Sequence, residues 1–511
     1  MPVPPYALRS APLIAMALAG CTVGPNHIPP ETAAPADWSS WRSGDASLRL
    51  PVASDATLPP DWWRAFNDPV LDDLQQRAVA ASPDLRTAAL HVAQARVQRG
   101  ATAAAGLPAI NAGAGVTRQR QSENGAGTRL LDVVSGNSGG DRDTLAKLLA
   151  EPFTLYQGGL DAAWEIDLWG KVRRSLEAAD ADLAERAALL AQARLTLASD
   201  VTRTYLELRA TQRKIAMTRQ DIAALESRAG IVAAQVRRGQ GTHLDIDRQQ
   251  SELQGLRASL PDLLAQEGAQ ASQLGLLLGE RPGALADLLK PADATAAAAL
   301  PDIALGLPSE LALRRPDIRA AEARLHGATA RIGVATADLY PSIRLGGGFN
   351  LESYKANSLF DWASRSWSIG PSIDLPIFDG GRRRRVVQLR ELEQREAAVA
   401  YQKTVLRAWQ EIGDALNGYA AERQRNAALR EKVTTSRDAL DLASARYRGG
   451  ITTYLEVIDA QRGWIQSTRD LADSDARIGT RYAAINKAIG NAPALADGDM
   501  GQGDGLEQGG R

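Results

Sequence analysis

The chain has 511 residues, and its 59 lysines and arginines nearly balance its 60 aspartates and glutamates. A chain without excess positive charge creates no bulk field that would attract nucleic acid, so we expect no nucleic-acid partner. Aromatic residues make up only 5% of the chain, which is few for one large globular core, and a single cysteine excludes an internal disulfide. Beyond residue 20 no apolar run reaches the ~18 residues that a transmembrane helix needs.

The first 20 residues predict a secretory signal peptide. Arg9 precedes an apolar stretch from Ala11 to Leu18, which is too short to span a membrane, and small residues then lead to Cys21. A lone cysteine at the end of such a signal predicts covalent lipid attachment. The alternative is an ordinary signal with a chance cysteine at its border. We therefore predict a signal peptide at 1–20 and a lipid anchor on Cys21, which would place the mature chain beside an envelope membrane.

The rest of the chain is a tandem repeat. Pro83-Asp84-Leu85-Arg86 reappears 233 positions later as Pro316-Asp317-Ile318-Arg319. Later landmarks recur at 211 positions, namely Arg237, Gly239, Leu244 and Gln250 as Arg448, Gly450, Leu455 and Gln461. Since a displacement kept over many positions is hard to obtain by chance, we predict a first repeat at 61–280 and a second at 316–491. Each repeat is predicted to contain, in order, a helix, two strands, a long helix and a further helix.

Four segments alternate between apolar and small or polar residues, the period of a strand. These segments are about 107–120, 152–169, 340–352 and 365–378. From Trp367 to Phe378 a strand extends about 36 Å, and at a tilt of about 40° it rises roughly 28 Å, close to the apolar band of a membrane barrel. Since four strands cannot close a barrel, the chain would have to oligomerise. The alternative is an ordinary half-buried antiparallel sheet.

The small or polar side of the predicted strands carries most of their charge. Its charged residues are Asp161, Glu165, Asp167 and Asp374, with Arg344. In a barrel these residues would give a mildly acidic lumen. The segment from 121 to 151 reads as an external loop between the first two strands.

Two segments, about 171–238 and 382–448, predict long helices. In the first, leucines recur every seven residues from Leu176 to Leu197, the spacing of a coiled-coil seam. A helix of that length extends about 100 Å. Shorter return helices are predicted at about 241–280 and 452–490, and short helices at 84–105 and 316–338. The alternative is a tethering or filament-like coiled coil, which leaves the four strands unexplained.

Both long helices begin with clustered positive charge. The clusters are Lys171, Arg173 and Arg174 in the first helix and Arg382, Arg383, Arg384 and Arg385 in the second. Positive charge at a helix start opposes the helix dipole, so local helix energetics do not favour it. We predict that these side chains meet lipid phosphates where strands give way to helices. The alternative is a solvated helix start.

Four motifs carry a resemblance to a known family. They are Cys21-Thr22-Val23-Gly24-Pro25, the repeated Pro83-Asp84-Leu85-Arg86, Trp164-Glu165-Ile166-Asp167-Leu168-Trp169-Gly170, and Arg446-Tyr447-Arg448-Gly449-Gly450 continued by Tyr454-Leu455-Glu456-Val457-Ile458-Asp459-Ala460-Gln461-Arg462. From Cys21 to about Asn491 the chain resembles the outer membrane factors of tripartite efflux systems, the TolC/OprM-like or NodT family.

The resemblance implies a mixed fold of α-helices and membrane β-strands. Each chain would contribute four strands to a trimeric 12-stranded barrel, which continues as a long periplasmic α-helical barrel. A small equatorial domain would be formed by the lipidated segment 21–60, an insert at 281–315 and the C-terminal end. Residues 492–511 are rich in glycine and aspartate, which predicts a disordered tail.

The resemblance also implies an outer-membrane exit duct that conducts substrates passively. Its partners would be two further copies of the chain, outer-membrane lipid, a periplasmic adaptor (membrane fusion) protein and an inner-membrane transporter of the proton-driven resistance-nodulation-division type. The alternative function is a lipid-anchored periplasmic scaffold or adaptor. The four histidines are scattered and no catalytic or metal-ligand spacing occurs. We therefore expect no enzyme, no metal and no cofactor beyond the lipid on Cys21.

The resemblance assigns three groups of site residues. Leu455 and Asp459 match the family's periplasmic gate, with Arg462 as a salt-bridging neighbour; the alternative is a core residue and a solvated acid near a turn. The adaptor-docking tips would be Arg238, Gly239, Thr242, Gly449, Gly450 and Thr452. The membrane interface would hold Trp164, Trp169, Trp367, Phe378 and the four arginines from Arg382 to Arg385. Because the first repeat has Arg248 where the second has Asp459, an acidic ring is expected from the second repeat alone.

Overall fold

The structure is a computed structural model that describes residues 22–30, 44–49, 59–125, 142–239, 242–291 and 314–492. The predicted signal peptide, Cys21, most of the insert at 281–315 and the tail from 493 lie outside the described residues. Within the described ranges, no helix has the length and apolar character needed to cross a bilayer. The chain forms two compact units. One contains residues 97–180 and 326–395 with the N-terminal residues to His27, and the other contains 28–96, 181–325 and the chain from 396 onward.

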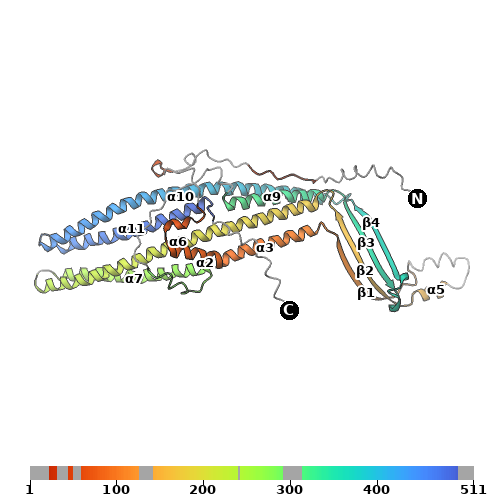
Figure 1. Ribbon diagram of the computed structural model, residues 1–511, viewed down its shortest axis with the longest axis horizontal. Helices are drawn as coiled ribbons and strands as arrows, with labels where there is room; N and C mark the ends of the chain where they lie inside the picture. The colour runs from red at the N-terminus through yellow and green to blue at the C-terminus, as the bar shows by residue number, and fades with distance from the viewer. Residues whose placement is uncertain are drawn as a thin grey trace. The chain divides into compact units, whose positions relative to one another are not determined.

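In the first unit, four strands form one antiparallel sheet in the order β1-β2-β3-β4 (Figure 1). The strands are β1 (Ala109–Gln119), β2 (Phe153–Ile166), β3 (Ser342–Ser353) and β4 (Arg365–Asp374). All four were predicted, but β4 ends four residues before the predicted boundary. Pro376 lies two residues beyond this end, although proline alone does not end this edge strand, since Pro371 pairs with Leu345 inside β4.

The strand register separates the two faces of the sheet. Leu160 pairs with Ala112 on one side and with Phe349 on the other, and Phe349 pairs with Trp367. On the opposite face, Asp161 lies between Asn111 and Gly348. The large apolar side chains exposed on the first face are Ile110, Val116, Leu160, Trp164, Leu345, Phe349, Trp367, Ile369 and Ile373. The predicted alternation is therefore confirmed, and one face of the sheet is apolar and uncovered in the single chain.

Two helices of 67 residues follow the strand pairs, α6 (Lys171–Arg237) and α10 (Arg382–Arg448). Each of them spans about 100 Å. They return as α7 (His243–Leu278) and α11 (Tyr454–Ala488), giving two helical hairpins (Figure 1). The shorter helices are α3 (Pro83–Ala104) and α9 (Pro316–Ala337). The prediction of a mixed fold with long helices and four strands is confirmed.

The largest core of the second unit surrounds a helix that the sequence did not single out, α2 (Pro69–Ala81). Leu71 and Leu74 of α2 are fully buried in one cluster with residues of α6, α7, α10 and α11, among them Val201, Leu278 and Ile412. Gln75 of α2 donates its side-chain amide to the Ala198 carbonyl oxygen at 2.8 Å. The low aromatic content is thus compatible with a core, because its few aromatic residues, among them Trp62 and Tyr205, are concentrated there with aliphatic residues from several helices.

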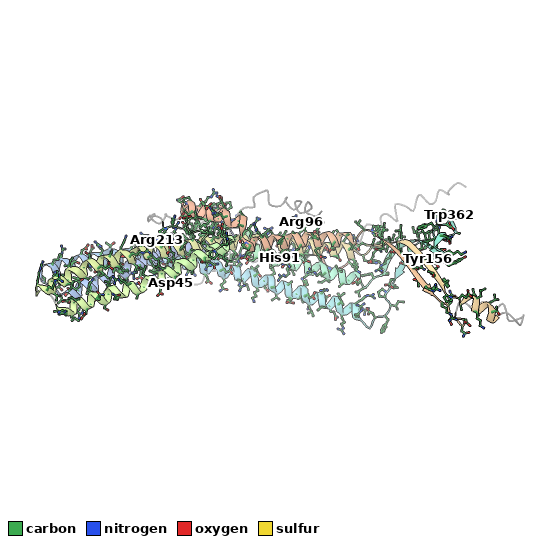
Figure 2. The ribbon with its side chains drawn as sticks, turned by 90° about the horizontal axis from the view of Figure 1, so that it is seen from below. Asp45, His91, Arg96, Tyr156, Arg213 and Trp362 are labelled. Carbon is green, nitrogen blue, oxygen red and sulfur yellow. The ribbon has the colours of Figure 1, made fainter. Side chains whose placement is uncertain are left out.

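A second unpredicted helix, α5 (Arg142–Leu149), lies in the segment predicted as an external loop. The β3–β4 connection at the same end of the sheet exposes Trp362, whose ring receives the Arg365 guanidinium at 4.4 Å. Figure 2 shows this tryptophan with Tyr156 of β2. Aromatic rings with nearby cations are typical of the polar boundary of a membrane-facing surface.

Candidate functional site

Each helical hairpin turns at a glycine with positive φ. Gly239 follows α6 with φ +75°, and Gly450 follows α10 with φ +69°, a conformation that glycine adopts without strain. At the second turn, the amide of Ile451 donates to the Arg446 carbonyl oxygen at 3.0 Å. At the first, Thr242 donates its amide and its hydroxyl to Asp245 at 2.9 and 2.8 Å. In the described residues, the second tip is therefore a tight turn, and the first tip is capped on its α7 side by Thr242 and Asp245.

The two hairpins contact each other directly beside these turns. Tyr454 is buried and donates its hydroxyl to Gln249 of α7 at 2.7 Å, and Tyr447 donates to Gln235 of α6 at 2.9 Å. Burial raises the pKa of Tyr454. Val232, Leu440, Val457 and Ile458 complete an apolar cluster here. Sequence reasoning missed these polar contacts, although Tyr447 lies on the seven-residue track of α10.

The three predicted gate residues share one face of α11, because they are four and three positions apart. Leu455 is 38% exposed and Asp459 is exposed, whereas Val457 and Ile458 between them are buried. Among the described residues, Asp459 makes no ion pair within the chain. Arg462 instead binds Glu252 of α7, with 2.6 Å between Nη2 and Oε2. Arg462 therefore joins the two hairpins, and Leu455 and Asp459 are left facing outward.

The predicted interface aromatics fall into two groups. Trp164 and Trp169 donate their indole N–H groups to the carbonyl oxygens of Gly106 and Pro341, at 2.9 and 2.7 Å. Trp367 and Phe378 are 75% and 92% exposed. Trp164 and Trp169 are therefore held by contacts within the protein. Trp367 and Phe378 are exposed and available to contact lipid.

The basic start of α6 differs from the prediction, since all three cations have protein partners. Lys171 pairs with Asp338 at 2.9 Å, Arg173 pairs with Asp167 at 3.1 Å, and Arg174 is buried. Buried Arg174 is therefore not available to lipid phosphate, whereas the side chains of Lys171 and Arg173 are 42% and 44% exposed and their lipid contact stays a prediction.

The basic start of α10 is more open. Arg384 and Arg385 are exposed, and Nη1 of Arg385 donates to the side-chain oxygen of Gln388 at 2.9 Å. Arg382 and Arg383 line a cavity of about 200 Å³ with Ala335, Asp338 and Val386. Arg382 and Arg383 therefore lie beside the end of α9, whereas Arg384 and Arg385 face solvent.

The polar face of the sheet carries paired charges. Arg344 contacts Glu165 across β2 and β3 at 3.3 Å, and Asn111 donates to Asp161 at 3.0 Å. Asp167 does not continue this row, because β2 ends at Ile166 and Asp167 accepts the amide of Val172 at the start of α6. Among the residues that the structure describes, no group of His, Cys, Asp and Glu is arranged to hold a metal ion.

Comparison with known proteins assigns the chain. A family model described as "Outer membrane efflux protein" matches residues 74–280 and 307–491. The chain is 35% identical to outer membrane protein OprJ of Pseudomonas aeruginosa over 454 residues, 89% of each chain. It is 33% identical to the pyoverdine export outer membrane protein OpmQ of Pseudomonas putida, covering 90% of this chain and 92% of that one. The solved outer-membrane channel OprN superposes with a TM-score of 0.81 at 30% identity, over 92% of this chain and 99% of that one. The chain belongs to the outer membrane efflux protein family.

Proposed function

We propose that the chain is one subunit of an outer-membrane exit duct in a tripartite efflux pump, and that substrates cross it passively. The observation that carries this proposal is the sheet with one exposed apolar face, continued by two 67-residue helices. A lipid-anchored scaffold would need the helices but gives no role to that apolar face. The names of the relatives, which include pyoverdine export for OpmQ, agree with an export role.

The apolar face has the height of a membrane's apolar layer. On β2 it runs from Ile166 to Tyr156, about 33 Å along the strand. At a tilt of about 40° this length rises roughly 25 Å, the height of the apolar band of outer-membrane barrels. Beyond Tyr156 the next position on this face is Thr154, which is paired with Arg118. Lipid would therefore meet the apolar face, and water would meet the face with Asp161, Glu165 and Arg344.

Three copies would complete the duct. Strands β1 and β4 are the two edges of the sheet, and an edge strand has unpaired backbone groups on one side. Pairing β4 of one copy with β1 of the next closes a ring, and three copies supply twelve strands, above the minimum of about eight. On α10, Leu392, Val399 and Leu406 form an exposed apolar stripe at seven-residue spacing, which suits a helix of a neighbouring copy.

Leu455 and Asp459 would form the gate of this trimer. A three-fold axis brings three copies of one exposed helix face together, so three Asp459 carboxylates would approach each other near a ring of Leu455. Mutual repulsion of the carboxylates makes such a closure sensitive to cations and to a bound partner. The adaptor protein would bind the tips at Arg238, Gly239, Thr242, Gly449, Gly450 and Thr452, and a resistance-nodulation-division transporter would supply the substrate.

Single-channel conductance in planar bilayers tests the function and the gate together. We expect small, rare currents from the wild type and larger, more frequent currents from Asp459→Ala, because removing the carboxylate weakens the closed arrangement. Asp438→Ala is the matched control, since it removes an exposed acid from α10. Silence from all three proteins, with each confirmed in the bilayer, would contradict the duct and support the scaffold. Equal currents from all three would contradict the gate assignment alone.

A further inference from the structure

The N-terminal residues Thr22–His27, the N-terminal strap, lie against α6 and α9 at positions where only glycine fits. A Cβ atom added to Gly24 would lie 2.5 Å from the Cα of Gly333 in α9. A Cβ added to Gly170 would lie 2.7 Å from Cγ2 of Thr22. Gly24 and Gly170 also have φ of +91° and +80°, which strain any other residue. The strap therefore contacts the backbone of both segments closely.

Arg174 holds the strap from the α6 side. Only 4% of Arg174 is exposed, and its Nη2 atom donates to the Asn26 side-chain oxygen at 2.6 Å. Its Nε atom donates to the Val23 carbonyl oxygen at 3.3 Å. The Val23 amide in turn donates to the Trp169 carbonyl oxygen at 3.1 Å. Charge-assisted hydrogen bonds donated by a buried arginine are strong and directional.

Glu177 and His326 extend the contact to the far end of the strap. Glu177 accepts from Arg174 at 2.7 Å and contacts the His326 ring nitrogen at 2.9 Å. The His326 ring stacks on His27 with 4.4 Å between centroids. One carboxylate thus neutralises the buried Arg174 and orients the ring on which the strap ends. We call Gly170, Arg174 and Gly333 the strap site.

The repeat provides an internal comparison. The counterparts of Gly333, Gly170 and Arg174 in the other repeat are Gly100, Gly381 and Arg385. A Cβ added to Gly100 or Gly381 would meet nothing within 4 Å, and Arg385 is exposed. Glycines and an arginine at equivalent positions of the other repeat therefore do not by themselves produce the close contacts seen at the strap site. The strap site is occupied in only one of the two equivalent positions of the described chain.

We propose that the strap site is a positioning site that fixes the lipid-bearing end of the chain level with the junction between strands and helices. This proposal rests on the proposed duct and on the lipid anchor that the sequence predicts at Cys21. Thr22, the neighbour of Cys21, contacts Gly170, four residues beyond the end of β2. The strap site thereby holds the lipid at the edge of the apolar face, where the inner surface of the outer membrane would lie.

A released strap could not hold the lipid at that level. Among the described residues, the N-terminal region next approaches the helices at Gly44, beside the Asn417 side chain, and at Ser47, whose carbonyl oxygen accepts from Gln424 at 2.8 Å. Without the strap contacts, the lipid would be tethered only through the chain between Cys21 and Gly44. Such a tether lowers the effective concentration of the lipid near the sheet, so the anchor would assist insertion less. Arg174 and the glycines act through the lipid and not through the pore.

The test is a double-mutant cycle between the strap site and the lipid. Gly333→Ala forces Arg174 aside, because the added Cβ would lie 2.8 Å from the arginine Cγ, while alanine is the better helix former. Gly100→Ala, its repeat counterpart, is the matched control. Each change is made in the lipidated chain and in an unlipidated chain with a general secretory signal and Cys21→Ser. The readout is the yield of assembled oligomer in the outer membrane.

A direct readout of the strap accompanies the yields. Maleimide labelling of Val23→Cys should become roughly tenfold faster with Gly333→Ala, since the buried hydrogen bonds of Arg174 are lost. Labelling of Ile28→Cys, an exposed position, should not change. If Gly333→Ala prevents all assembly, Gly24→Ala opens the same contact from the strap side without altering α9.

We expect Gly333→Ala to lower the oligomer yield of the lipidated chain and to add no loss in the unlipidated chain. Equal losses in both chains, or unchanged Val23→Cys labelling, would overturn the proposal. Equal yields of lipidated and unlipidated wild type would overturn it as well, while leaving the duct intact. Conductance separates the strap proposal from the duct proposal, because Gly333→Ala protein that does insert into the membrane should conduct as the wild type does. A silent wild type would contradict the duct and leave the labelling result standing.

Discussion

Asp167 and Asp379 lie between a strand and a long helix, and each accepts backbone hydrogen bonds at the helix start. Asp167 accepts from the amides of Val172 and Arg173 at 3.0 and 3.1 Å. Asp379 accepts from Gly381 and Arg383 at 3.0 and 3.2 Å. These carboxylates satisfy amides that the helix leaves free and offset the basic residues that follow. The alternation of apolar and polar residues predicted Asp167 to lie on the polar face of the second strand. A period of two does not show where a strand ends, and β2 ends at Ile166.

Asp379 should make the start of α10 sensitive to acid. The hydrogen bond from the Arg383 amide, followed by that from Gly381 and the charges of Arg383 and Arg382, lowers its pKa below 3.8 against an opposing effect of burial. A depressed carboxyl pKa stabilises the folded state above the unfolded-state pKa, and this contribution is lost as the pH falls through the folded-state pKa. A spin label at Leu389→Cys should therefore become more mobile below about pH 3.8.

The control for this acid effect is Asp379→Asn. The amide cannot titrate, so the label should be more mobile than in the wild type at neutral pH and should show no acid step. The same acid step in Asp379→Asn would assign the transition to another group.

The coiled-coil seam was predictable because each of its contacts follows from one helix period. On α6, Leu197, Val201, Leu208 and Ile215 are all buried, as their seven- and four-residue spacing predicts. The contacts between hairpins were not predictable, since they join residues that are distant in sequence. Tyr454 and Gln249 are 205 positions apart, and Arg462 and Glu252 are 210 apart. Each is a contact between the repeats, so only their packing could reveal it.

Tyr454→Phe should loosen the tip where the hairpins meet. It removes a hydroxyl from a buried hydrogen bond with Gln249, and leaving a buried acceptor unpaired costs about 1–3 kcal/mol. Hydrogen exchange should accelerate in 243–250 and 454–461 and stay unchanged in α9. Tyr354→Phe, at an exposed tyrosine, is the control. Exchange that accelerates uniformly, or not at all, would contradict a local role for this hydrogen bond.

At the scale of the whole molecule, the single chain leaves several apolar surfaces uncovered. The apolar face of the sheet and the stripe of Leu392, Val399 and Leu406 on α10 are both exposed. A soluble monomer rarely exposes such contiguous apolar surface. The proposed duct covers the first surface with lipid and the second with a neighbouring copy, so the fold is complete only in an assembly.

Val399→Asp should prevent assembly without unfolding the chain. Val399 is 64% exposed in the single chain, so a charge there costs little in the monomer but would be buried without a partner in the trimer. Size-exclusion chromatography with light scattering should show a monomer whose helical circular dichroism matches the wild type. Ala400→Asp, at an exposed position about 100° around the helix from Val399, should remain trimeric. A trimeric Val399→Asp protein would exclude this stripe from the interface.

The four strands, the long helices and the tandem repeat can all be predicted from the order of the amino acids alone. Strands show a period of two and the long helices a period of seven, while the repeat shows a constant displacement. Because the backbone of a strand or helix rises regularly, residues at such a period lie on one face of the element. Only the folded chain shows that Arg462 pairs with Glu252, that Asp167 caps α6 and that Arg174 binds the N-terminal strap. These outcomes depend on which of several possible partners lies within about 3 Å, and that distance is set by packing between segments that no local period relates.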